Sequence, residues 1–132
     1  MSLRTPMARA LGHGSAKSGV AHWTSQRVSA IALALLALWF VSALLRMPDF
    51  AYATVLGWIG APVNAVLLVL LTGTAAYHAF LGVQVVIEDY VHGHGLKVAA
   101  LLLVAFLHVV VAAFGIFAVL RIAFAGAGPL TV

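Results

Sequence analysis

Three long apolar stretches separated by short polar segments dominate the chain after residue 27. The first covers residues 28–45 without a charged side chain, the second about 63–87, and the third about 96–124. Each has about 18 residues or more, enough for a helix to cross a bilayer. The pattern predicts an all-α integral membrane protein with three transmembrane helices in one membrane domain, residues 28–132.

Turn-forming and interfacial residues occupy the gaps between these stretches. Pro48 ends the first span, because proline cannot continue a helix comfortably. The following loop contains Tyr52 and Trp58, aromatic residues suited to the membrane interface, and residues 55–59 are expected to form a short interfacial piece. Glycines in residues 91–97 predict a tight turn between the second and third spans.

The second span is unusually polar for a membrane helix. Such helices usually face a bundle interior or a cofactor. The span contains several polar side chains: Asn64, Thr72, Thr74, His78 and Gln84. His78 is about 13 Å of helix rise from Ile87, which places it near the bilayer midplane.

Helical geometry groups three residues of this span on one face. Gly82 lies about 40° around the helix from His78, and Asp89 about 20° around and roughly 16 Å further along. A buried imidazole beside a glycine suits an axial haem ligand. An acid and the phenol of Tyr90 at the membrane edge suit a site that binds a carbonyl and moves protons. Alternatively, His78 hydrogen-bonds a neighbouring helix, and the acid and the phenol are interfacial anchors.

Composition narrows the chemistry that this chain can carry. Of its 132 residues, 64% are hydrophobic and 8% are charged. There is no cysteine and no glycine-rich phosphate loop, so any flavin, nucleotide or iron–sulfur cluster must belong to a partner. The net charge of +4 comes mostly from a basic N-terminal segment, residues 1–27, which is expected to be cytoplasmic and not to bind nucleic acid.

Counting cations predicts the orientation. With the N-terminus inside, five cations lie on the inner side, against two outside, which favours a cytoplasmic N-terminus and an external C-terminus. The inner five are Arg4, Arg9, Lys17, Arg27 and Lys97, and the outer two are Arg46 and Arg121.

Four further histidines have less defined predicted roles. His92 and His94 lie in a glycine-containing turn without a third ligand, which is more typical of solvent-exposed residues than of a metal site. In antiparallel neighbours, His108 would lie at a depth similar to that of His78. It could ligate the same haem, or it could be a hydrogen-bonded core residue, the interpretation we favour. The role of His22 is left open.

The motif His78-x3-Gly82-x6-Asp89-Tyr90 resembles the signature of the small membrane anchor (cytochrome b556-type) of succinate dehydrogenase, or complex II. The run from Gly14 to Gly19, followed by His22-Trp23-x2-Gln26-Arg27-Val28-Ser29-Ala30, is similar to the entry of the first helix in bacterial members. The resemblance implies half of a six-helix heterodimeric anchor bundle in the bacterial inner membrane, in preference to the mitochondrial one.

The resemblance also implies a role for each matched residue. His78 would be an axial ligand of haem b, with the other axial ligand supplied by a partner, the second, cytochrome b anchor subunit. Tyr90 would hydrogen-bond ubiquinone. Asp89 would lie beside that site and either assist proton delivery or hold an arginine of a partner. Arg27 would lie near a haem propionate or the quinone pocket.

The implied complex divides its chemistry among its subunits. A flavoprotein subunit would oxidise succinate and an iron–sulfur subunit would carry electrons to the membrane, so this chain would hold no succinate-oxidising site. The complex would serve the citric acid cycle and the respiratory chain. Two alternatives stay open: the anchor of a fumarate reductase, and a non-redox membrane accessory or transport subunit.

Overall fold

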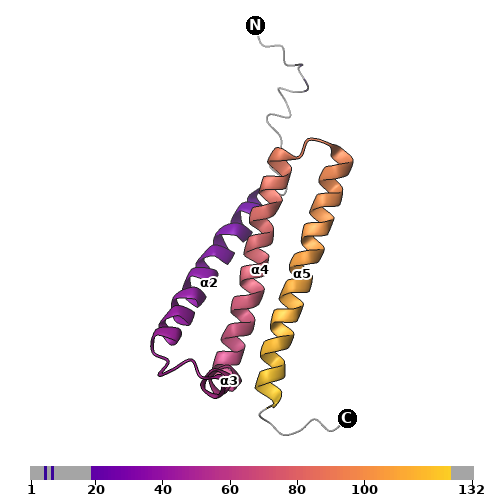
Figure 1. Ribbon diagram of the computed structural model, residues 1–132. Coiled ribbons are helices and arrows are strands. Elements are labelled where there is room, and N and C mark those ends of the chain that lie inside the picture. Colours follow the sequence, from indigo (N-terminus) through magenta and orange to yellow (C-terminus); the bar gives the residue numbers. More distant parts are fainter. Residues whose placement is uncertain (1–4, 6, 8–18, 126–132) are drawn as a thin grey trace.

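The computed structural model describes Thr5, Met7 and residues 19–125 of the chain. Residues 19–125 form four α-helices, α2 (Gly19–Leu45), α3 (Tyr52–Gly60), α4 (Pro62–Tyr90) and α5 (His94–Ala125), and contain no strand (Figure 1). Three of these helices, α2, α4 and α5, are long and apolar enough to cross a membrane. The predicted all-α, three-span membrane fold is therefore confirmed.

Helix α4 is the centre of the arrangement. It packs against α2 on one side and α5 on the other, while α2 and α5 do not contact each other (Figure 1). The short α3 lies across the end of the bundle remote from the α4–α5 turn and contacts both α4 and α5. The polar second span predicted from the sequence is thus the one helix that contacts all the others.

Helix α2 begins at Gly19, well before the predicted start of the first span at residue 28. Hydropathy marks the part of a helix that lipid can surround, and a helix can continue past it into a polar region. Within this extension the guanidinium of Arg27 lies 5.3 Å from the ring centre of Trp23. The predicted polar segment 1–27 is therefore helical over its last residues, and most of the rest of it lies outside the described residues.

The segment that joins α2 to α4 is more ordered than its sequence predicted. The expected interfacial piece, residues 55–59, is part of α3. Its Trp58 ring stacks on Trp39 of α2 at 5.8 Å, and the Asn64 amide donates a hydrogen bond to the Trp58 carbonyl at 2.8 Å. The Thr54 hydroxyl and the Ala51 N–H bind the carboxylate of Asp49 and lower its pKa.

The α4–α5 turn is short, as the sequence predicted, because only residues 91–93 separate the two helices. The Lys97 ammonium donates a hydrogen bond to the Glu88 carbonyl at 2.7 Å. Further along the pair, Gly115 of α5 lies directly against Thr72 of α4, where an added Cβ would be 2.7 Å from the Thr72 Cγ2. This glycine allows the two helices to approach closely.

Few side chains are buried within this single chain. The buried residues of the three long helices are Ser29, Ala65, Leu68 and Leu81. Large apolar side chains are exposed along α2, α4 and α5. A surface of this kind suits contact with lipid or with other membrane helices.

Candidate cofactor-binding site

His78 of α4 is held by a residue of another helix. Its Nδ1 lies 3.0 Å from the Oγ of Ser29 on α2, and this serine is only 6% exposed. The same hydroxyl donates a hydrogen bond to the carbonyl of Gln26 at 3.1 Å. No hydrogen bond in the described part of the chain engages the other ring nitrogen, Nε2. His78 therefore has one nitrogen fixed by the protein and one available to a ligand.

His78 lines an open groove of about 900 Å³ between the first turns of α2 and the last turns of α4. Gly82, one turn on from His78, also lines it, and a Cβ added at Gly82 would meet nothing within 4 Å. The predicted clear space beside the imidazole is thus present. A flat apolar group can approach His78 there without displacing a side chain.

Polar groups line the same groove on both helices. Arg27 comes from α2 and Glu88 from α4, where the Glu88 Oε1 accepts a hydrogen bond from Gln84 at 2.8 Å. The His22 Nε2 and the Gln26 Oε1 are both buried without a hydrogen-bond partner. Buried polar atoms normally have partners, so these two indicate a bound group or water.

The other two predicted site residues do not line this groove. Tyr90 and Asp89 lie at the end of α4, and both are exposed, Tyr90 to 77%. Of the four predicted site residues, the chain brings together only His78 and Arg27 in one groove. A quinone pocket at Tyr90 and Asp89 therefore needs walls from another subunit.

His108 belongs to α5, which packs on α4 on the side away from α2 (Figure 1). Its Nδ1 donates a hydrogen bond to the Val104 carbonyl at 2.8 Å, and its ring packs against Phe80 with ring centres 6.0 Å apart. It lines a separate cavity of about 290 Å³ between α4 and α5. The geometry agrees with the hydrogen-bonded core residue and does not pair His108 with His78. His92 and His94 are exposed, and the described residues contain no cluster of three metal-ligating side chains.

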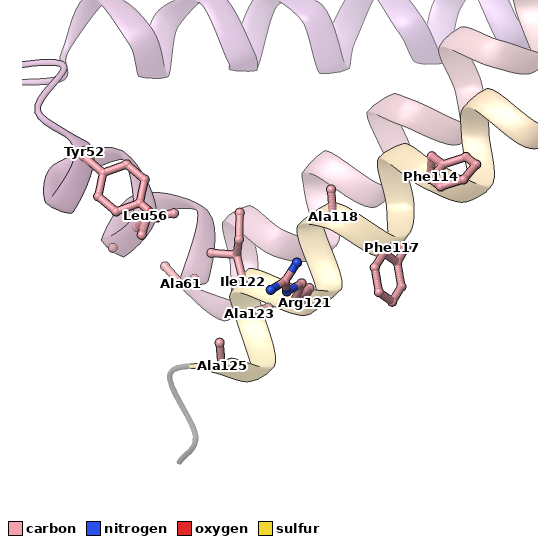
Figure 2. A pocket seen from close by; sticks show the side chains of 12 residues that line it. Tyr52, Leu56, Ala61, Phe114, Phe117, Ala118, Arg121, Ile122, Ala123 and Ala125 are labelled. Atoms are coloured by element: carbon pink, nitrogen blue, oxygen red, sulfur yellow. The ribbon is translucent and has the colours of Figure 1, made fainter. Parts of the chain in front are cut away.

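A larger cavity, of about 1090 Å³, lies at the opposite end of the molecule between α3 and α5 (Figure 2). Its lining is mostly apolar, with Tyr52 on α3 and Phe114 and Phe117 on α5, and Arg121 is its one charged residue. None of the four predicted site residues belongs to it. The four predicted site residues therefore lie away from this cavity.

The fold and the groove define an all-α integral membrane protein in which two spans, α2 and α4, enclose an open groove lined by His78 and Arg27. The family model of the succinate dehydrogenase/fumarate reductase transmembrane subunit matches residues 1–118. The chain therefore belongs to this family, and its relatives support a membrane anchor subunit of succinate dehydrogenase, part of an oxidoreductase complex.

Three of these relatives are named succinate dehydrogenase hydrophobic membrane anchor subunit. The Rickettsia bellii protein is 38% identical over 94 residues, covering 71% of this chain and 75% of its own length. The Rickettsia conorii protein is 36% identical over 102 residues, or 76% and 81%. The Paracoccus denitrificans protein is 32% identical over 128 residues, or 97% and 96%. These findings do not support the alternative of a non-redox accessory subunit.

Sequence reasoning assigned no functional role to Ser29 or to Glu88. Ser29 is 49 residues from His78, and only the packing of α2 on α4 brings the two together. Glu88 precedes Asp89, and the facing helix decides which of these two acids borders the groove. Ser29 belongs to the run that resembles the entry of the first helix in bacterial members, but a hydroxyl in an apolar span is too common to identify a site.

Proposed function

We propose that this chain supplies one axial ligand of a haem b, which it shares with a second anchor subunit, and part of a ubiquinone site. One observation carries the first part: the His78 Nδ1 is bonded to Ser29, Nε2 has no hydrogen bond to any described residue, and His78 lines an open groove together with Gly82. Iron is bound by the unprotonated nitrogen of a neutral imidazole, and an orienting bond to the other nitrogen is usual for such ligands.

The residues of the groove fit this group. Arg27 can pair with a propionate, since guanidinium binds carboxylate with two parallel hydrogen bonds. The unpartnered His22 Nε2 and Gln26 Oε1 can take polar atoms or water at the same end. When bound, haem b supplies a one-electron redox centre between the other subunits and the quinone.

Tyr90 and Asp89 are the residues that we assign to ubiquinone. The Tyr90 phenol can donate a hydrogen bond to a carbonyl, and the Asp89 carboxylate can hold a proton close to water. Both are exposed at the end of α4, beside the short turn that precedes α5. Their exposure in the single chain supports a site completed by other subunits.

The proposed complex contains three partners: the cytochrome b anchor subunit, an iron–sulfur subunit and a flavoprotein subunit. Together, the two anchors would form a six-helix bundle in a bacterial inner membrane with this N-terminus in the cytoplasm. The soluble subunits would dock on the side that carries Tyr90. The relatives above are named for succinate dehydrogenase, which favours succinate oxidation over fumarate reduction.

The test is a reduced-minus-oxidised absorption spectrum of membranes that contain the whole complex. His78→Ala should abolish the b-type signal or convert it to a high-spin form, because iron loses a ligand. His108→Ala is the matched control, and it should leave the spectrum unchanged, since this ring bonds within its own helix. A wild-type spectrum and midpoint potential in His78→Ala would remove His78 from the coordination sphere.

A further inference from the structure

We propose that Ser29 is the positioning residue of His78: its oxygen accepts the Nδ1 proton and so keeps Nε2 unprotonated and aimed for ligation. This inference rests on the proposed haem ligation by His78. It concerns a residue of α2 that lies outside the motif of α4, and it assigns to that hydroxyl a role in tuning the redox centre.

The direction of the hydrogen bond follows from the partners of the hydroxyl. Ser29 Oγ is 3.1 Å from the Gln26 carbonyl oxygen and 3.0 Å from the His78 Nδ1. A carbonyl can only accept, so the single hydroxyl proton is directed to Gln26. The oxygen lone pair then faces the imidazole, which must donate from Nδ1. A neutral imidazole that carries its proton on Nδ1 has its lone pair on Nε2.

Burial makes this arrangement persistent. Ser29 is the one buried polar residue among the described side chains, at 6% exposure. Water cannot readily replace either of its partners there, and an unmade hydrogen bond in such a place is costly. The hydroxyl is therefore a fixed acceptor and does not exchange between protein and solvent.

His108 shows what is special about this contact. Its Nδ1 also donates a hydrogen bond, but to a carbonyl four residues back in the same helix. A bond of that kind fixes a ring relative to its own helix only. His78 is fixed relative to α2, the helix that also supplies Arg27 to the groove. The α2–α4 packing thereby sets the angle of the ring toward any group bound in the groove.

The hydrogen bond also has an electronic consequence. A donor Nδ1–H with a good acceptor makes the imidazole more basic, and a more basic ligand favours the ferric state over the ferrous. Removing the acceptor should therefore raise the midpoint potential. In Ser29→Ala, the ferric-to-ferrous ratio at a fixed ambient potential should fall on the order of tenfold, which is a shift of about 59 mV for one electron.

The experiment is a redox titration of haem b in membranes that contain the whole complex. Ser29→Ala removes the acceptor, and Ser29→Cys replaces it with a weak one of similar shape. Ser29→Thr keeps the hydroxyl and should restore the wild-type potential. Ser42→Ala is the matched control, because the Ser42 hydroxyl also lies on α2 and donates to the carbonyl three residues back, that of Trp39, at 2.8 Å.

The results separate this inference from the one on which it rests. An upward shift in Ser29→Ala and Ser29→Cys, with Ser42→Ala unchanged, supports it, and so does loss of haem from an assembled Ser29→Ala complex. An unchanged potential in either Ser29→Ala or Ser29→Cys overturns it, and Ser29→Cys decides alone if Ser29→Ala does not accumulate. If His78→Ala loses the haem signal while both Ser29 variants match wild type, only the present inference fails. If His78→Ala keeps the wild-type signal, both fail.

Discussion

Two conservative substitutions can distinguish a role of Tyr90 and Asp89 in quinone reduction from a role in assembly of the complex. Tyr90→Phe removes the proposed hydrogen bond to ubiquinone, which would be worth about 0.5–1.5 kcal/mol net, so ubiquinone should bind roughly two- to tenfold more weakly. The rate should fall by at least as much, because a donor also stabilises the charge that develops on a quinone oxygen as it is reduced. Asp89→Asn keeps the size but removes the proton acceptor, and it should impair the same activity.

The measurement is the ratio of two activities in isolated membranes: succinate to ubiquinone, and succinate to a soluble artificial acceptor. Only the first should fall in these variants. Tyr52→Phe is the control, because Tyr52 is equally exposed but lies on α3 at the other end of the bundle. A parallel fall of both activities would assign the two residues to docking, and no fall would make them interfacial anchors.

At the scale of single residues, the sequence predicted what depends on one helix. The open space at Gly82 beside His78 follows from helical periodicity. The Ser29 contact, by contrast, depends on how α2 rotates against α4, and an apolar helix with no polar stripe does not encode that rotation locally. For the same reason, the sequence did not predict that Glu88, and not Asp89, borders the groove.

Between elements, the closest approach is that of α5 to α4 at Gly115. Gly115→Ala should destabilise the assembled protein by about 1–3 kcal/mol, because its Cβ would be 2.7 Å from the Thr72 Cγ2. Thermal unfolding of the detergent-solubilised complex measures this. Adding Thr72→Ser removes that methyl group and should recover most of the loss.

Gly73→Ala is the comparison for this variant. A Cβ at Gly73 would meet nothing within 4 Å, and alanine is the better helix former by about 0.5–1 kcal/mol, so stability should be unchanged or raised. Equal loss in both glycine variants would mean that the effect is not specific to the α4–α5 contact.

Helix number and order were predictable, whereas helix ends were less so. Apolar runs long enough to span a bilayer identified α2, α4 and α5. The early start of α2 at Gly19 lies in polar sequence, where hydropathy carries no information about helix formation. The helical form of α3 depends in part on the tertiary contact of Trp58 with Trp39, which the local sequence does not reveal.

For the whole molecule, we expect obligate assembly. The chain exposes apolar side chains on all three spans. The groove between α2 and α4 is also open, and polar side chains line it. Expressed without its partner subunits, the chain should therefore be degraded or aggregate, whereas co-expression with a second anchor should restore accumulation. Stable, monodisperse purification of the chain by itself would contradict this expectation.

The two partners of the Ser29 hydroxyl also bear on the order in which the chain enters the membrane. During synthesis α2 reaches the bilayer before α4 exists. Its hydroxyl can already donate to the Gln26 carbonyl of its own helix, so α2 can enter lipid without an unmet donor. The Nδ1–H of His78 bonds to Ser29 of α2 in the folded chain, so this hydrogen bond forms only once α2 is in place. The first helix thus provides the surface on which the second packs, and under the proposed ligation the nitrogen that binds iron would be set by this packing before a cofactor binds.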